Sequence, residues 1–188
     1  MNVYLIRHTS IDIEPGICYG QSDVDVADSF AGDAEKVRQK LSEISLEAPV
    51  FYSSPLQRCH KLARVLASHT IHVEPRIQEL NFGDWELKKW EQIPERILEK
   101  WSKDIRVPCP GGESYLELNN RVVEWWKELR ETGHQAVVVI THAGVIQSVL
   151  AHVLGMAFRN SSRLVIDWGH FSAVSVNRRN YVVRFINR

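Results

Sequence analysis

Residues 136–144, Ala-Val-Val-Val-Ile-Thr-His-Ala-Gly, decide the fold class of this chain. Five consecutive apolar residues, most of them β-branched, are typical of a central strand that is covered on both faces. The strand leads directly into Thr141-His142 and then into a helical pattern that runs to about Leu154. A buried strand that passes at once into a helix is typical of an α/β sheet.

The rest of the chain alternates strand and helix signals in the same way. Apolar runs predict strands at 2–6, 48–52 and 71–73, and helical spacing predicts a helix at 30–45. Ser54 and Pro55 predict a second helix, with serine as N-cap, whose core side carries Leu56, Leu62, Ala63, Val65 and Leu66. Residues 79–132 predict several helices interrupted at Pro94, Pro108 and Pro110, and 163–186 predict strands that end in a hairpin around 178–180. The alternation indicates a mostly parallel sheet with helices on both faces.

Composition limits the class of protein. The 188 residues are 44% hydrophobic, which suits one domain over 1–188. Lys+Arg and Asp+Glu are equal at 23, so the charge does not indicate a nucleic-acid or membrane partner. The three cysteines are widely spaced, as in reduced thiols, and no leader or long apolar stretch is seen, so we expect a cytoplasmic protein. A homodimer is compatible with these features.

Three predicted strands end in polar groups. The first ends in Arg7-His8, the second in Ser53-Ser54 with Arg58 one turn into the next helix, and the strongest in Thr141-His142. Ligands of open α/β sheets bind beyond the carboxyl ends of the strands. We therefore expect two arginines and two histidines to converge on one edge of the sheet.

These four side chains suit a phosphoryl group, which has three equatorial oxygens that need fixed donors. The forked guanidiniums of Arg7 and Arg58 match that geometry, and His142 supplies a further donor. His8 can attack phosphorus with one ring nitrogen if the other donates to a backbone carbonyl, and the nearby arginines favour its neutral form. The remaining histidines are interpreted as ordinary surface or core residues: His60, His69, His72, His134, His152 and His170.

A leaving alkoxide also needs a proton donor, and a carboxylic acid is the usual choice. Glu79 precedes an aromatic, glycine-containing stretch that would partly desolvate its carboxyl group. Asp84, Glu86 and Glu113 are competing candidates. The chemistry of the residues alone does not choose among the four.

The motifs named so far resemble those of the histidine phosphatase (phosphoglycerate-mutase-like) superfamily. The similar segments occur in that family's order over residues 3–145: Leu5-Ile6-Arg7-His8-Thr9, Ser53 to Arg58, Glu79 with Phe82 to Glu86, Pro110 to Ser114, and Ile140 to Gly144. The resemblance implies a three-layer α/β/α sandwich and a phosphohistidine intermediate on His8. It also implies a phosphate pocket of Arg7, Arg58 and His142, with Glu79 as the general acid and with no cofactor or metal.

Within this superfamily the short chain and the stretch after Glu79 are similar to phosphatases rather than mutases. The loop at residues 16–24 resembles that of the cobalamin-pathway α-ribazole phosphatases, which implies α-ribazole phosphate or adenosylcobalamin phosphate as substrate. Family members place a substrate-covering cap at about 79–126. Candidate substrate contacts are Tyr19, Gly20 and Gln21 in the loop and Trp85 or Trp90 in the cap, where a tryptophan could stack on a flat base.

Alternatives remain open from the sequence. Thr9 and Glu14 stand where the family more often has glycine and a phosphate-contacting asparagine. A broad-specificity or sugar phosphate phosphatase, or a phosphoglycerate mutase-like enzyme, would use the same groups, and a phospho-ligand binding module would keep them without turnover. A magnesium-dependent phosphatase is disfavoured because no strand end is rich in aspartate. In each case the partner is a small-molecule phosphate ester.

Overall fold

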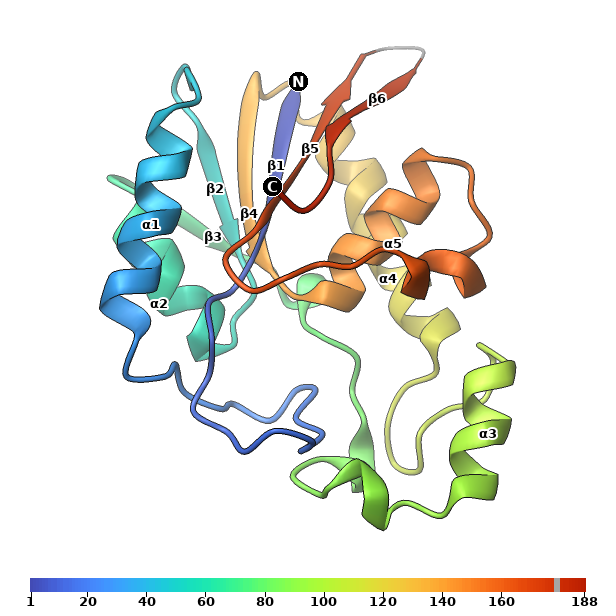
Figure 1. The fold of residues 1–188 in the computed structure, drawn as a ribbon. Coiled ribbons are helices and arrows are strands. Elements are labelled where there is room, and N and C mark those ends of the chain that lie inside the picture. The colour runs from blue at the N-terminus through green and yellow to red at the C-terminus, as the bar shows by residue number, and fades with distance from the viewer. Residues whose placement is uncertain (178–179) are drawn as a thin grey trace.

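The computed structural model describes residues 1–177 and 180–188, and these residues contain a six-stranded sheet in the order β3-β2-β4-β1-β5-β6 (Figure 1). Strands β1 to β4 run parallel, whereas β5 is antiparallel to both β1 and β6. The prediction of an α/β fold with a mostly parallel sheet is therefore confirmed. The strands are β1 (Asn2–Arg7), β2 (Val50–Ser53), β3 (Ile71–Val73), β4 (Ala136–Thr141), β5 (Phe171–Val176) and β6 (Tyr181–Phe185).

Helices cover both faces of the sheet, which gives three layers. Helices α1 (Phe30–Ser42) and α2 (Gln57–Leu66) lie on one face, and α4 (Tyr115–Glu131) and α5 (Ala143–Val153) lie on the other (Figure 1). Strand β4 serves both layers because successive side chains of a strand point to opposite faces. Val138 packs in the α1 and α2 cluster and Val139 in the α4 and α5 cluster. All six residues of β4 are buried, as predicted for a central strand.

The segment between β3 and α4 lies beyond the carboxyl ends of the parallel strands, together with the loop after β1 (Figure 1). The two segments are joined through backbone hydrogen bonds, among them Cys18 N–H to the Lys88 carbonyl at 2.9 Å and Trp90 N–H to the Gly16 carbonyl at 2.9 Å. This places both segments over the edge where β1, β2 and β4 end. The segment contains short 3-10 helices at Pro75–Ile77, Gly83–Trp85 and Trp90–Gln92 and the helix α3 (Glu95–Lys103); a further 3-10 helix, Phe158–Arg163, follows α5.

Several expected boundaries are wrong. Helix α2 begins at Gln57, two residues after the start expected at Pro55, and Ser54 is not its N-cap. Val65 was expected in the core but is 42% exposed. Residues 115–126 were expected in the insertion, but they form the first part of α4, whose apolar side packs in the core cluster of the sheet.

The last strands differ from the prediction at one end. Strand β5 begins only at Phe171, because 163–170 form the end of a 3-10 helix and a loop that turns at Gly169 with φ +68°. Strands β5 and β6 pair antiparallel, as a hairpin requires. The predicted turn around 178–180 falls largely on 178–179, which lie outside the described residues.

Candidate active site

The structure brings the three strand ends together because β1, β4 and β2 are neighbours in the sheet. The rings of His8 and His142 lie edge to face with centroids 5.2 Å apart. The backbone N–H of His8 donates to the Thr141 carbonyl at 3.0 Å and so continues the β1–β4 register past the end of β1. His8, Arg58 and His142 are each at most 1% exposed. Two imidazoles and a guanidinium thus form a buried cluster at the sheet edge.

The hydrogen bonds of His8 fix its tautomer. Its Nδ1 lies 2.7 Å from the Thr9 carbonyl oxygen. A carbonyl only accepts, so Nδ1 carries the proton and Nε2 keeps a lone pair. Burial first, and then the positive charges of Arg58 and Arg7, hold the pKa of His8 well below its ordinary value. His8 is therefore neutral at neutral pH, as we expected, although burial is a larger cause than the arginines.

His142 is also a neutral, buried imidazole. Its Nε2 lies 2.8 Å from the Ser54 hydroxyl oxygen and 3.5 Å from the Cys59 sulfur. Burial, followed by the charge of Arg58, holds the pKa of His142 well below its ordinary value. The Ser54 hydroxyl also accepts the N–H of Leu56, the residue before α2, at 3.4 Å.

The two arginines hold the loop after β1 and keep donors unused. Arg58 donates to the carbonyls of Gly20 and Ser22 at 2.6 and 2.8 Å, and Arg7 donates to the Tyr19 hydroxyl at 3.3 Å. The Tyr19 ring lies over Arg58, 5.2 Å from Cζ to the ring centroid. The Nε–H groups of both arginines are buried and lack an acceptor in the part of the chain that the structure describes. Buried donors normally have a partner, so these groups suit an anionic ligand.

Glu79 faces a cavity beside this cluster. Its carboxylate accepts the N–H of Leu80 at 2.9 Å and that of Gly144, at the start of α5, at 3.2 Å. A Cβ on Gly144 would collide with the Glu79 Oε1, so the close approach of the carboxylate to α5 requires glycine there. The carboxylate thus lies between the helix start and open space.

The three competing carboxylates have other surroundings. Glu86 accepts the N–H groups of Gln21 and Phe82 at 2.9 and 3.0 Å and also binds Ser22. Glu113 forms an ion pair with a helix arginine, described below, and Asp84 is exposed. Of the four candidates, Glu79 is the one that lines the cavity.

The cavity has a volume of about 220 Å³ and a largely apolar wall. Trp90 lines it, whereas Trp85 is 5% exposed and packs edge to face on Trp101 at 5.3 Å. A tryptophan contact to a ligand therefore falls to Trp90 rather than Trp85. The lining residues are Ile17, Cys18, Tyr19, Gly20, Glu79, Leu80, Phe82, Trp90, Tyr115, Ala143, Gly144 and Gln147.

Tyr115 and Gln147 were not among the residues selected from the sequence. Tyr115 follows directly on the Pro110 to Ser114 motif, and Gln147 lies one helical turn after Ala143 and Gly144, so nearness to a motif was the available signal. Gln21 was selected as a substrate contact, but its side chain donates to the Glu79 carbonyl at 3.0 Å and does not line the cavity. Burial raises the pKa of Cys18 to about 12, so its thiol stays protonated, as expected for an inert cysteine.

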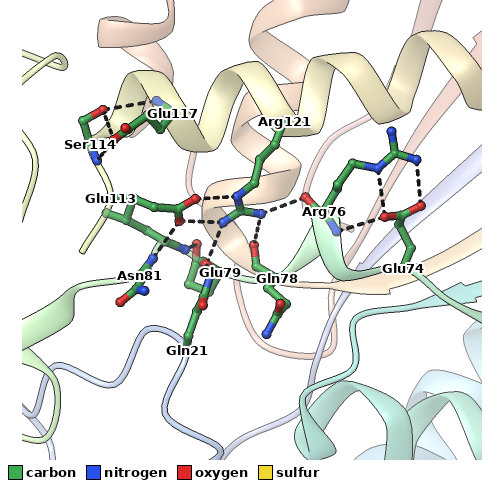
Figure 2. A network of polar contacts seen from close by, with 11 residues as sticks. Gln21, Glu74, Arg76, Gln78, Glu79, Asn81, Glu113, Ser114, Glu117 and Arg121 are labelled. Carbon is green, nitrogen blue, oxygen red and sulfur yellow. Dashed lines mark hydrogen bonds and ion pairs between the residues drawn. The ribbon is translucent and has the colours of Figure 1, made fainter. Parts of the chain in front are cut away.

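A polar network lies behind Glu79 (Figure 2). Its centre is the guanidinium of Arg121 on α4, which pairs with Glu113 and donates to three backbone carbonyls of the segment that carries Glu79. The sequence analysis missed Arg121. No motif marks it, and its spacing of eight residues from Glu113 indicates a contact only once α4 is in place.

Together these groups can bind a phosphoryl group with fixed positive charge, accept it on a neutral ring nitrogen and exchange one proton with a carboxylate. The fold and the site therefore define an α/β enzyme that acts on phosphate esters. Comparison with protein families makes this class specific, because the profile of the histidine phosphatase superfamily (branch 1) matches residues 3–188. The chain belongs to that family and is a phosphatase.

Individual relatives span the whole chain. It is 26% identical over 197 residues to the adenosylcobalamin/alpha-ribazole phosphatase of Escherichia coli K12, covering 100% of this chain and 96% of the relative. It is 28% identical over 200 residues to phosphoserine phosphatase 1 of Hydrogenobacter thermophilus, covering 100% and 92%. The crystal structure of the alpha-ribazole phosphatase from Shigella flexneri superposes with a TM-score of 0.90 at 24% identity, covering 100% and 96% of the two chains, which supports the same fold.

Among residues 1–177 and 180–188 no helix has the length and apolar character to cross a membrane. Nor does this part of the chain hold a group of three or more His, Cys, Asp or Glu residues that could ligate a metal ion.

Proposed function

We propose that this phosphatase hydrolyses phosphate monoesters through a phosphohistidine on His8, and that its substrate is α-ribazole 5′-phosphate or adenosylcobalamin phosphate in cobalamin nucleotide-loop assembly. The proposal includes a cytoplasmic location, with Cys18, Cys59 and Cys109 unpaired. In this proposal the enzyme binds a small-molecule phosphate ester and binds neither nucleic acid nor a membrane. A homodimer is compatible with it.

In the first step the Nε2 lone pair of His8 attacks phosphorus and the bond from phosphorus to the ester oxygen breaks. Arg7, Arg58 and His142 surround the phosphoryl oxygens, and the unused Nε–H groups of the arginines donate to them. Glu79 gives its proton to the leaving alkoxide. The Nδ1–H bond to the Thr9 carbonyl holds the His8 ring and stabilises the positive charge that the ring gains.

In the second step Glu79, now a carboxylate, takes a proton from water. The resulting hydroxide oxygen attacks phosphorus, the bond from phosphorus to Nε2 breaks, and inorganic phosphate leaves. His8 returns to its neutral form and Glu79 is protonated again, so one water is consumed per ester. The site thus needs no group beyond the five residues at the sheet edge and cavity.

The observation that carries the substrate proposal is the character of the cavity wall. Among the described residues that line it, Glu79 is the one charged side chain, and the rest are mainly aromatic or aliphatic. A leaving group with a carboxylate, such as serine or glycerate, would find no cation there and would face Glu79. A neutral ribose with a flat benzimidazole base would instead pack against Trp90 and Tyr115.

Kinetic comparison tests the substrate. We expect kcat/KM for α-ribazole 5′-phosphate to exceed the values for phosphoserine, glycerol 3-phosphate and p-nitrophenyl phosphate. Replacing Trp90 with Ala should remove about tenfold of that preference by loss of stacking, with little change for glycerol 3-phosphate. Equal kcat/KM values across the four esters would refute the substrate and favour a broad-specificity phosphatase.

Replacement of His8 tests the mechanism. The His8→Ala variant should neither turn over ester nor form an acid-labile phosphoenzyme, because the neighbouring imidazole, His142, already has its Nε2 hydrogen-bonded to the Ser54 hydroxyl. The Trp85→Phe variant serves as a control, since Trp85 is packed away from the cavity. Hydrolysis at the unaltered rate after His8→Ala would exclude the phosphohistidine.

A further inference from the structure

Arg121 makes five hydrogen bonds with one guanidinium (Figure 2). Its Nε and Nη2 donate to the two oxygens of Glu113 at 2.7 and 2.8 Å. Its Nη1 donates to the carbonyls of Arg76 and Gln78 at 2.7 and 2.8 Å, and Nη2 also donates to the carbonyl of Glu79 at 2.9 Å. The side chain is 18% exposed, so these bonds are largely shielded from water. All five N–H donors of the guanidinium are therefore used, by the backbone of residues 76–79 and by the Glu113 carboxylate.

That stretch carries the carboxylate of the cavity. Between the 3-10 helix Pro75–Ile77 and the next one at Gly83, the residues belong to no helix or strand. Buried backbone carbonyls need donors, and here Arg121 supplies them. On the far side of Glu79, the Asn81 N–H donates to Glu113 at 2.9 Å. Arg121 and Glu113 together therefore hold the chain before and after Glu79.

We infer that Arg121 is a positioning residue for proton transfer, acting through the backbone of 76–79 on the Glu79 carboxylate; this rests on the proposed function, in which Glu79 is the general acid. The planar fork is essential to the role. A lysine would keep the charge but carries its three N–H donors on a single nitrogen, which cannot reach three carbonyls and a carboxylate together. Arg121 touches neither the cavity nor the phosphate cluster through the contacts of its guanidinium.

A positioning role predicts an effect that depends on the leaving group. The general acid matters for an alkyl ester, whose alkoxide must be protonated, and matters little for p-nitrophenyl phosphate, whose phenolate leaves unaided. The ratio kcat/KM reports the first chemical step and excludes the later attack of water, in which Glu79 also acts. We expect Arg121→Lys to lower kcat/KM about 100-fold for glycerol 3-phosphate and less than about fivefold for p-nitrophenyl phosphate, as a displacement of about 1 Å would.

Arg76→Lys is the matched control. Arg76 lies in the same segment, and its guanidinium pairs with Glu74 and Glu128 near the surface, at 3.0 and 2.7 Å. We expect this variant to keep both kcat/KM values, even if it loses as much stability in a urea titration as Arg121→Lys does. A loss of activity that merely follows stability would affect both esters alike.

Glu79→Gln separates this inference from the proposed function. If Glu79→Gln slows both esters equally, the acid role of Glu79 is wrong and the inference falls with it. If Glu79→Gln slows only the alkyl ester while Arg121→Lys slows both esters or neither ester, Glu79 remains the general acid and the positioning role of Arg121 is refuted. When Glu79→Gln is already present, adding Arg121→Lys should lower kcat/KM for glycerol 3-phosphate by less than about a further threefold. The two residues act on the same step, so their effects should not multiply. Should Arg121→Lys fail to fold, Glu113→Gln is measured in its place with the same expectation.

Discussion

Replacing Gly144 with Ala should damage catalysis while leaving the fold as stable as before. Gly144 is the second residue of α5, and its N–H donates to Glu79 at 3.2 Å. A Cβ added there would overlap the Glu79 Oε1 and would lie 3.2 Å from the Leu118 Cδ2. The Glu79 carboxylate is the group that can yield, because it borders the cavity, whereas Leu118 is fully buried.

The size of the effect follows from these contacts. Ordinary contact between a methyl carbon and an oxygen needs roughly 3.5 Å, so the carboxylate must retreat by about 1 Å. A displacement of this size in a general acid costs about 100-fold in rate. Alanine is better than glycine within a helix by up to about 1 kcal/mol, so the free energy of unfolding should stay level or rise. Activity and stability should therefore change in opposite directions.

Hydrolysis of glycerol 3-phosphate and urea-induced unfolding are the two assays. Gly32→Ala is the matched control, because Gly32 is also near the start of a helix and a Cβ there would meet nothing within 4 Å. It should show the gain in stability with unaltered kcat/KM. Two results would refute the reasoning for Gly144→Ala: an unaltered rate, or a loss of rate matched by a loss of stability.

Three further predictions concern stability and the loop. Because the pKa values of His8 and His142 are lowered on folding, the unfolded chain binds more protons than the folded chain below about pH 6.5. The free energy of unfolding should therefore fall with falling pH, by up to about 1.4 kcal/mol per pH unit for each histidine. Equal urea midpoints at pH 7 and 5.5 would contradict this. Leu150→Ala, at a fully buried position of α5, should cost about 2–5 kcal/mol in urea unfolding, against about 0.5 or less for Val165→Ala at a 65% exposed one; similar costs would refute the core assignment. Glu86→Gln should raise KM for the ester about tenfold, since an amide cannot accept all the N–H bonds that hold the loop; an unaltered KM would show that the loop is held otherwise.

The phosphate side of the site could be predicted because regular structure positions it. A buried strand fixes where its last residue lies, so Arg7-His8 and Thr141-His142 had to appear at strand ends. Arg58 was expected one turn into the helix after β2; it is the second residue of α2, and its side chain is buried at the cluster all the same. The order of the strands could not be read from the chain, yet any order that kept these three strands adjacent would have produced the same cluster.

The choice of acid could not be made from residue chemistry, because it depends on which carboxylates are occupied by other partners. Glu86 is used by the N–H groups of the loop after β1, and Glu113 by Arg121, which lies on another element. Neither contact leaves a pattern in the spacing of residues. The family resemblance selected Glu79, and of the four candidate carboxylates it is the one that lines the cavity.

The start of α2 shows how a local rule fails at a functional site. Ser54-Pro55 has the composition of a helix N-terminus, and in an ordinary helix the serine hydroxyl would cap it. Here that hydroxyl lies 2.8 Å from the ring of His142 and accepts the Leu56 N–H at 3.4 Å, and the helix begins at Gln57 without a side-chain cap. A departure from a strong capping signal can therefore itself indicate a competing partner for the serine.

The phosphate cluster and the leaving-group cavity are held by different means, and this limits how the substrate can change. Backbone register fixes His8 against Thr141, so side-chain substitutions in the loop after β1 leave the backbone of His8 in place. Glu79 lies on irregular backbone whose carbonyl is held by Arg121 and by Gln21, at 2.9 and 3.0 Å. Because Gln21 belongs to the loop that borders the cavity, a change of that loop that displaces Gln21 also loosens the acid. We therefore expect a loop that keeps the Gln21 contact to accept a new leaving group with less loss of rate than a loop that lacks it.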